Sequence, residues 1–419
     1  MDSGKRLIFR LNRLRERLWF RPLMFSVLSV ISVFAARIID GSELSELLPS
    51  ISRDTVETLL SILAASMLVI ATFAVGSMVA AYTSASSNGT PRAFGLVLRD
   101  DVSQIAHSAF VGSFIFSVVA RVAVEEGYFE PTGYFTIFAV AMCVFAIVIL
   151  VFVRWVDRIA RLGLLGPIID KTERATMLML QDRLRAPLLG GKPAGAEPFK
   201  GQAVPVPSPG HVQEIHVRKL QSWAEEANAR LRLAALPGDF LMPGDPLAWV
   251  AFDSPPDSED WPEAVSCCFT LGPDRVFDQD PRFGFVVLSE IAVRALSPGI
   301  NDPGTANKVI QTMIRLLHFW YRQPVEHTAE SACDRIEVPE LSMRGVFNDA
   351  FTAIGRDGAG MVEVAVTLQR ALASLAGLDN RAMAEAADDH ARMALARAEQ
   401  ALVMAEDLAA VRRAAGIER

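Results

Sequence analysis

The sequence contains little charge and few cysteines for its length. Only 21% of its 419 residues are charged, whereas an average soluble protein carries about 25%. Its four cysteines are too few for a disulfide scaffold, so the composition excludes a cystine-rich secreted protein. A formal net charge of -7 argues against a nucleic-acid partner, because phosphate binding needs a basic surface. We therefore expect no nucleic-acid binding, and the length predicts two or three domains.

The sequence also lacks the common catalytic and metal-binding motifs. It has no phosphate-binding GxxxxGK loop, no HExxH, no CxxC and no GxSxG. Cys267 and Cys268 are adjacent, a spacing that suits neither a zinc finger nor a redox pair. The cluster Asp278, Asp280 and Arg282 could do acid–base work or bind a cation, but a solvated turn is the simpler interpretation. We predict no enzyme, no cofactor and no metal site.

What the sequence does contain is a large excess of apolar residues, which lies almost entirely before residue 155. Four apolar segments run from Pro22 to Ile39, Thr58 to Tyr82, Ile105 to Val124 and Tyr134 to Val153. Each is close to the roughly 20 residues that a membrane-spanning helix needs. Buried helices of a soluble protein are the alternative, but four such segments in so short a stretch favour a transmembrane domain over residues 22–155.

Basic residues lie in alternate loops of this domain. Residues 1–21 form a basic N-terminal segment, and arginines recur at Arg92, Arg99, Arg154 and Arg158, whereas the other two loops are poor in lysine and arginine. The positive-inside rule then places both termini in the cytoplasm. The segment from Lys5 to Arg21 also has apolar residues at helical spacing. It is either an amphipathic helix on anionic membrane lipid or a plain anchor.

The second apolar segment is rich in small and hydroxyl-bearing residues. Small residues at helical spacing let helices approach closely, so ordinary helix packing explains the pattern. Alternatively, the segment lines a pore, with hydroxyl groups that attract water and Phe73 as a hydrophobic constriction. Four spans are too few to enclose a conduction path, so a pore requires a homo-oligomer. The candidate pore-lining residues are Ser66, Thr72, Phe73, Gly76 and Ala80.

The sequence after the fourth segment has an ordinary soluble composition, which we expect in the cytoplasm. Residues 156–209 are typical of a juxtamembrane helix followed by a linker rich in glycine and proline. In residues 210–282, two Pro-Gly-Asp turns, at Pro237–Asp239 and Pro243–Asp245, flank short apolar runs and predict a small β-rich module. The turns resemble those of biotinyl and lipoyl carrier domains, but the lysine that carries the prosthetic group is absent.

Residues 283–419 predict a helical region, with a break near Gly377. The fold class is therefore an α-helical membrane protein, in which four transmembrane helices precede a mixed α/β cytoplasmic domain with a small β-rich module and a helical C-terminus. Length, composition and periodicity together support this assignment.

A polar loop from Ser297 to Ala306 separates two apolar helical segments. Pro298 and Gly299 end the first helix, and Asn301 or Asp302 caps the second, so local geometry explains the residue types. A ligand or subunit-contact role is the alternative, because a helix N-terminus can hold an anion and polar loops often carry function. The candidate residues for that role are Arg294, Ser297, Asn301, Asp302 and Thr305.

Several stretches together resemble one bacterial family. They are Ser108–Val119, Phe152–Arg161 and Ala295–Ala306, with the shorter Pro237–Asp239 and Gln279–Pro281. These residues are similar to the predicted-membrane-protein family catalogued as domain of unknown function 2254. The similarity runs over most of the chain, and the loop from Ser297 to Ala306 is its most specific part. It implies a bacterial inner-membrane protein, and it implies no activity or catalytic residues.

Two functions fit this sequence. The first is a homo-oligomeric ion channel, lined by the second apolar segment and gated by the cytoplasmic domain. The second is a membrane-anchored sensor or scaffold without transport activity, whose ligand is unknown. A proton-driven transporter is disfavoured because no carboxylate lies in the middle of a span. A tethered enzyme that uses Asp278, Asp280 or Asp302 is the weakest hypothesis.

Overall fold

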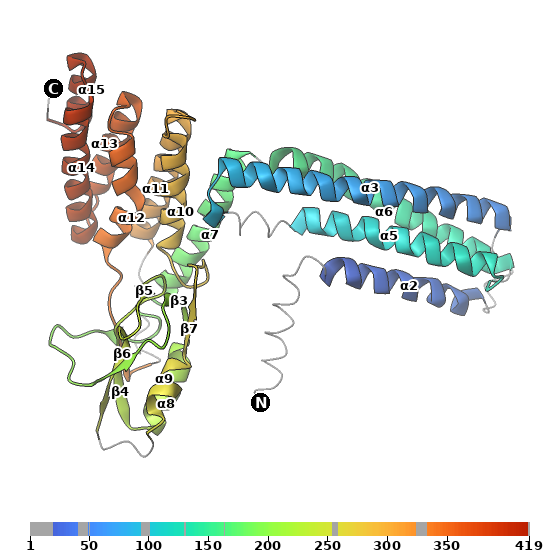
Figure 1. The fold of residues 1–419 in the computed structure, drawn as a ribbon, viewed down its shortest axis with the longest axis horizontal. Helices are drawn as coiled ribbons and strands as arrows, with labels where there is room; N and C mark the ends of the chain where they lie inside the picture. The colour runs from blue at the N-terminus through green and yellow to red at the C-terminus, as the bar shows by residue number, and fades with distance from the viewer. Residues whose placement is uncertain are drawn as a thin grey trace. The chain divides into compact units, whose positions relative to one another are not determined.

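The computed structural model describes residues 20–40, 49, 51–93, 101–129, 131–162, 164–253, 259–323 and 333–417. The chain divides into two compact units, Met1–Ile168 and Ile169–Arg419. Figure 1 follows both units in chain order, from the blue N-terminal helices to the red C-terminal ones. The predicted basic segment, apart from Phe20 and Arg21, lies outside the described residues, as does Arg99.

The first unit consists of apolar helices. They are α2 (Phe20–Asp40), α3 (Arg53–Asn88), α5 (Asp101–Glu125) and α6 (Pro131–Leu162). Three stretches are long and apolar enough to cross a membrane, namely Arg53–Ser86, Val102–Glu125 and Gly133–Arg161, whereas the apolar stretch of α2, Phe20–Ala35, is shorter. The expectation of several apolar helices is confirmed, and a membrane span at the first predicted segment, Pro22–Ile39, stays a prediction.

Small residues explain why α5 packs against each of the other three helices. A Cβ atom added at Gly112 would lie 3.0 Å from the Cβ atom of Phe25 on α2, a tight contact that glycine avoids. Ser108, Ser113 and Ser117 are buried, and each hydroxyl donates a hydrogen bond to the carbonyl four residues earlier. Their polar groups are thus satisfied within the helix, as an apolar environment requires.

The second unit begins within α7 (Leu165–Arg185) and continues into two small sheets. The five-stranded sheet has the order β1-β8-β4-β6-β2, and the three-stranded sheet has the order β5-β3-β7. The strands of the first sheet are β1 (Lys192–Pro193), β2 (Gln202–Pro205), β4 (Ala229–Leu233), β6 (Pro246–Phe252) and β8 (Ile336–Val338); those of the second are β3 (Gly210–Ile215), β5 (Phe240–Leu241) and β7 (Phe269–Gly272). One apolar core joins them, with Val212, Leu231, Leu247 and Ile336 among its buried residues.

The sheets differ from the expectation in their extent. The segment predicted as a linker contributes two strands, because β2 pairs with β6 in antiparallel register and β1 pairs with β8 in parallel register. The strand β8 also comes from the region predicted as helical, and it pairs with β4 in parallel register. These strands have two to four residues, too few for an alternating pattern to appear in the sequence.

Short helices flank the strands, and a longer helical bundle follows them. The short helices are α8 (Val217–Glu226) and α9 (Trp261–Ser266); the bundle contains α10 (Phe283–Ala295), α11 (Pro303–Arg322), α12 (Met343–Asp357), α13 (Val362–Ala376), α14 (Arg381–Ala401) and α15 (Ala405–Ala414). The predicted break is confirmed, since α13 ends at Gly377. The second unit is therefore a mixed α/β structure that is mostly helical.

Ion pairs join α7 to the bundle. Arg315 on α11 makes a bidentate contact with Glu173, in which its Nε and Nη2 atoms lie 2.9 and 2.8 Å from the two carboxylate oxygens. Lys308 lies 3.7 Å from Asp170. Gly284 on α10 lies so close to Thr176 that an added Cβ atom would collide with this side chain. The part of α7 from Asp170 to Thr176 is thus fixed against the helical bundle of the second unit.

Candidate functional site

Local hydrogen bonds satisfy Ser297 and Asp302 in the predicted polar loop before α11, whereas the buried Nε atom of Arg294 has no hydrogen-bond partner among the described residues. Asp302 caps the helix: its Oδ1 atom accepts the backbone N–H of Thr305 at 3.0 Å, and its Oδ2 atom accepts the Thr305 hydroxyl at 2.5 Å. These bonds lower the pKa of Asp302. The Ser297 hydroxyl donates to the Arg294 carbonyl, and Asn301 adopts a left-handed conformation with a φ of 50°. Local geometry accounts for Ser297, Asn301, Asp302 and Thr305, and the ligand or subunit role of the loop stays a prediction.

The five candidate pore-lining residues share the exposed face of α3. Ser66, Thr72, Phe73, Gly76 and Ala80 are all exposed within the chain, and Phe73 has 64% of its surface accessible. The Thr72 hydroxyl bonds to the Leu68 carbonyl in the same helix. The Phe73 ring meets Trp155 edge to face, with centroids 6.2 Å apart. A pore-lining role for this face stays a prediction.

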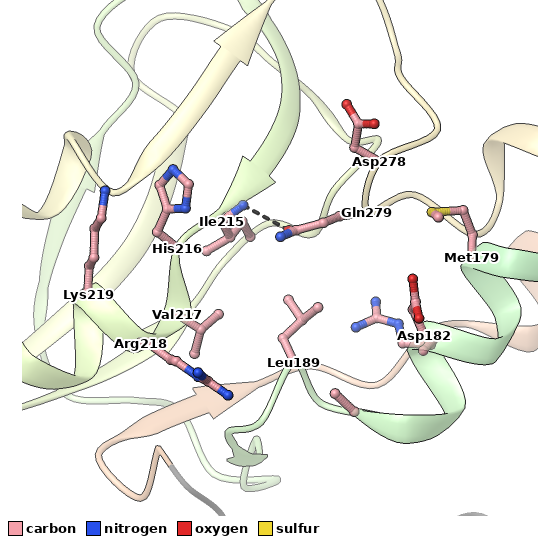
Figure 2. Close-up of a pocket in the computed structure, with 12 residues that line it drawn as sticks. Met179, Asp182, Leu189, Ile215, His216, Val217, Arg218, Lys219, Asp278 and Gln279 are labelled. Atoms are coloured by element: carbon pink, nitrogen blue, oxygen red, sulfur yellow. Dashed lines mark hydrogen bonds between the residues drawn. The ribbon is translucent and has the colours of Figure 1, made fainter. Parts of the chain in front are cut away.

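A cavity in the second unit offers a different site. Its volume is about 530 Å³, and the residues that line it come from the end of α7, the chain just after α7, the turn between β3 and α8, and the loop before α10. Figure 2 shows Met179 and Asp182 of α7 facing the turn residues Ile215 and Val217 across this space. The volume lies in the range of small-molecule sites.

The turn between β3 and α8 is held from both sides. The backbone N–H of Ile215 donates to Oε1 of Gln279 at 3.0 Å, as Figure 2 shows, and the N–H of His216 donates to the Cys268 carbonyl at 2.9 Å. The helix α8 then starts at Val217, and its N-cap residue His216 makes no side-chain cap bond. The first N–H groups of a helix have no acceptor within it. The N-terminus of α8 therefore faces the cavity uncapped.

Arg183 is the unusual residue of the pocket. Its side chain is only 6% exposed, and within the described part of the chain no group accepts a hydrogen bond from its Nε or Nη1 atom. Burial disfavours the charged form and lowers the pKa of Arg183 to about 10, although the negative charge of Asp280 opposes this shift. The guanidinium thus remains protonated at neutral pH. A buried, incompletely paired charge is costly to folding, which makes it a marker of a functional site.

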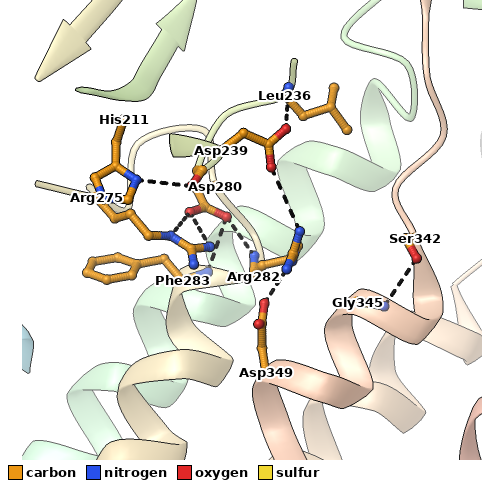
Figure 3. A network of polar contacts seen from close by, with 11 residues as sticks. His211, Leu236, Asp239, Arg275, Asp280, Arg282, Phe283, Ser342, Gly345 and Asp349 are labelled. Carbon is orange, nitrogen blue, oxygen red and sulfur yellow. Dashed lines mark hydrogen bonds and ion pairs between the residues drawn. The ribbon is translucent and has the colours of Figure 1, made fainter. Parts of the chain in front are cut away.

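A buried ion-pair network, drawn in Figure 3, lies beyond the pocket lining and begins at Asp280, the residue after Gln279. Asp280 is only 2% exposed, and its carboxylate accepts hydrogen bonds from Nε of Arg275 at 2.7 Å and from the backbone N–H groups of Arg282 and Phe283 at 3.0 and 3.2 Å. Burial raises the pKa of Asp280, and the charge of Arg275 opposes that rise. The predicted solvated turn is therefore wrong for Asp280.

The first Pro-Gly-Asp turn packs directly on this carboxylate. Gly238 has a φ of +98°, and a Cβ atom added there would collide with the Asp280 carboxylate. The turn is closed by the Asp239 N–H bonding to the Leu236 carbonyl, while Oδ2 of Asp239 accepts the Leu236 N–H at 2.9 Å. Two of the short stretches that carry the family resemblance, Pro237–Asp239 and Gln279–Pro281, thus meet at one point.

The network extends from this turn to the helical bundle. The Nε atom of Arg282 lies 2.7 Å from Oδ2 of Asp349 on α12, and its Nη1 atom lies 4.0 Å from Oδ1 of Asp239. Figure 3 shows Arg282 between these two carboxylates. The network thereby connects the first Pro-Gly-Asp turn with the helical bundle of the second unit.

The pocket has no features of a metal centre. Over the described residues, no three histidine, cysteine or acidic side chains gather where they could hold a metal ion. His211 lies in β3, whereas His216 follows the strand as the N-cap residue of α8. Cys268 is buried and Cys267 is exposed.

Sequence reasoning missed Arg183. A signal for it exists, because Arg183 lies on the same face of α7 as Thr176, Leu180 and Leu184, all of which are buried. An arginine on the apolar face of an amphipathic helix is unusual and needs an explanation.

The comparisons with known proteins support the membrane assignment. A family model described as "Predicted membrane protein (DUF2254)" matches residues 15–374. Uncharacterized proteins of Mycobacterium tuberculosis (strain CDC 1551 / Oshkosh) and Mycobacterium bovis are each 26% identical to the chain over 242 residues, which covers 54% of this chain. The matched region covers 45% of each relative, so the match spans about half the length of these proteins. No solved structure matches the chain. The chain belongs to the DUF2254 family of predicted membrane proteins.

Proposed function

We propose that the protein is a membrane-anchored ligand-binding protein. Its apolar helices hold it in the bilayer, and the pocket at the end of α7 binds a small ligand. The observation that carries this proposal is the buried guanidinium of Arg183 on the wall of a cavity of about 530 Å³, with Nε and Nη1 unpaired among the described residues. A buried guanidinium with unpaired N–H groups lowers the stability of the fold, whereas a bound ligand would supply acceptors for these groups. No catalytic step is proposed.

The test is protection of the purified full chain against thermal unfolding in detergent. The probe set contains AMP, glucose 6-phosphate, citrate, glutamate, adenosine and glucose. The variant Ala186→Phe fills the pocket, because Ala186 lines it with a small side chain. We expect at least one compound to raise the unfolding midpoint of the wild type and to leave that of Ala186→Phe unchanged. Equal protection of both proteins, or protection of neither, would overturn the proposal.

We place the protein in the inner membrane of a bacterium, with both termini in the cytoplasm. Arg154, Arg158 and Arg161 follow the apolar part of α6, and basic residues of this kind remain on the cytoplasmic side. A C-terminal green fluorescent protein fusion should therefore fluoresce in a bacterial host, and a C-terminal alkaline phosphatase fusion should be inactive. The reverse pattern would place the second unit outside the cytoplasm.

A homo-oligomeric ion channel is the second candidate, and one observation favours it. Ser66, Thr72, Gly76 and Ala80 lie on an exposed face of α3, where they are free to meet a second copy of the chain. A ring of subunits with this face inward would place Phe73 in the path. Light scattering should then give a mass of at least three subunits, and Phe73→Ala and Thr72→Val should change the conductance of a planar bilayer. A monomer without conductance would exclude the channel.

A further inference from the structure

We infer that the pocket binds the phosphate group of a small organic phosphate, an inference that rests on the proposed ligand-binding function. Several observations lead to this ligand class: the sign of the buried charge, the uncapped helix that faces it, and the apolar lining of the remaining space. The inference names Arg183 and the first turn of α8 as the phosphate-binding groups.

The buried charge of the pocket is positive. Arg183 is the one charged side chain that is buried among those lining the described pocket; Asp182, Arg218, Lys219 and Asp278 are all exposed. Asp182 lies 3.4 Å from Arg185, so its charge is partly balanced on the outside. An anion that enters the cavity therefore meets an arginine in a region of low dielectric, where the attraction is strong.

The N-terminus of α8 provides backbone hydrogen-bond donors in addition to those of the Arg183 guanidinium. Val217 and Arg218 occupy its first two positions, and both line the cavity. The N–H groups of Lys219 and Leu220 already bond to the His216 carbonyl, which leaves the first two positions for a ligand. A helix N-terminus and a planar guanidinium are each well suited to phosphate oxygens, and together they offer donors from two directions. Lys219 and Arg218 add positive charge at the exposed edge.

The apolar part of the pocket suits the organic part of such a ligand. Met179, Ala186, Leu189, Ile215 and Val217 line it with apolar surface, and the cavity is far larger than a bare phosphate ion. Small-molecule sites have this composition, in which an apolar lining surrounds a few polar groups that fix the orientation. The same phosphate chemistry can belong to a free metabolite or to a lipid headgroup, so the experiment needs one probe for each source.

The competing explanation is a structural Arg183, held by its attraction to the buried Asp280 carboxylate. A structural arginine would be needed for folding and indifferent to phosphate. The variants Arg183→Met and Arg185→Met separate these explanations, since Arg185 is an exposed arginine of the same helix that does not line the pocket. Lys219→Gln is a second test at an exposed position, where a substitution leaves the core intact.

The experiment is isothermal titration calorimetry of the full chain in a non-ionic detergent. AMP is the metabolite probe, with adenosine as its control without phosphate. Dihexanoyl phosphatidic acid is the lipid probe, with dihexanoyl glycerol as its control. We expect at least one phosphate probe to bind and its control not to bind. Arg183→Met should weaken this binding by about 100-fold, the size of one lost charge-assisted hydrogen-bond pair, and Lys219→Gln by about fivefold. Arg185→Met should bind as the wild type does.

The outcomes are distinct. Binding by AMP or by phosphatidic acid, lost in Arg183→Met, supports the inference and identifies the source of the phosphate. Equal affinity of Arg183→Met and the wild type overturns it, as does binding by neither phosphate probe. Protection by a neutral compound that Ala186→Phe abolishes would keep the ligand-binding function and reject the phosphate. If no compound protects the wild type against thermal unfolding, both the ligand-binding function and the phosphate inference are rejected.

Discussion

Gln279 bonds to Ile215: its Oε1 atom accepts the backbone N–H of the last residue of β3 at 3.0 Å. This bond joins the loop that carries Asp280 to the strand that leads into α8. Together with the bond from the His216 N–H to the Cys268 carbonyl, it fixes the start of α8 beside the pocket. A displacement of the loop at Gln279 would move the start of α8 relative to Arg183.

The two Pro-Gly-Asp turns provide a matched pair for testing the packing against Asp280. Both glycines have a positive φ, +98° at Gly238 and +96° at Gly244, so alanine is strained at either position. Only at Gly238 would the new methyl group also strike the Asp280 carboxylate; around Gly244 no described atom lies within 4 Å of it. We expect Gly244→Ala to lower the free energy of unfolding by about 1 kcal/mol and Gly238→Ala by at least about 3 kcal/mol. Equal losses in urea unfolding would contradict this contact.

Removal of the negative charge of Asp280 should leave Arg275 without its ionic partner. Asp280→Asn keeps the shape of the side chain, but Arg275 is only 16% exposed and would retain an unpaired buried charge. The expected loss is about 3 kcal/mol in the free energy of unfolding. Asp278→Asn is the control, since Asp278 is exposed and should change stability by less than about 0.5 kcal/mol. Comparable unfolding midpoints for the two variants would show that the network is not stabilising.

The cap of α11 should depend on pH. Hydrogen bonds from Thr305 lower the pKa of Asp302 below its ordinary value of 3.8, so the stability from its charged form is present above that value and is lost as the pH falls through the lowered pKa. Asp302→Ala should cost about 1 kcal/mol at pH 7. Asp302→Asn should retain most of the cap and lose the acid dependence. A full loss in Asp302→Asn at pH 7 would show that the charge, not the cap geometry, stabilises the helix.

His390 should make the bundle sensitive to mild acid. It is buried, its Nδ1 atom lies 2.8 Å from the Ala386 carbonyl, and burial lowers its pKa below the ordinary 6.5. Its neutral form therefore stabilises the fold above pH 6.5, and this contribution is lost as the pH falls through the lowered pKa. His390→Gln should reduce the change of the unfolding midpoint between pH 7.5 and about pH 5. A midpoint of His390→Gln that falls with pH as steeply as that of the wild type would contradict this role of His390.

The parts of the fold that sequence predicted well depend on local chemistry. The cap at Asp302, the helix end at Gly377 and the two Pro-Gly-Asp turns each need only a few neighbouring residues with specific backbone preferences. The apolar helices need only length and composition. These features can be predicted without knowledge of the tertiary structure.

The pocket could not be predicted because its walls are distant in sequence. Arg183, Val217 and Gln279 meet only after β3 and the loop before α10 have packed. Asp280 appeared solvated because its own neighbours are polar, whereas its burial comes from Gly238 and Arg275. Strands of two to four residues, such as β1 and β2, are likewise defined by their partners and not by their own pattern.

The thermal unfolding midpoint of Arg183→Met in detergent, after dialysis to remove small molecules, tests the central claim most directly. If Arg183 is kept for a ligand, its replacement by an apolar side chain removes a buried, incompletely paired charge, and we predict a midpoint equal to or above that of the wild type. A fall of more than about 5 °C would show that the guanidinium stabilises the fold and would contradict the ligand-binding pocket.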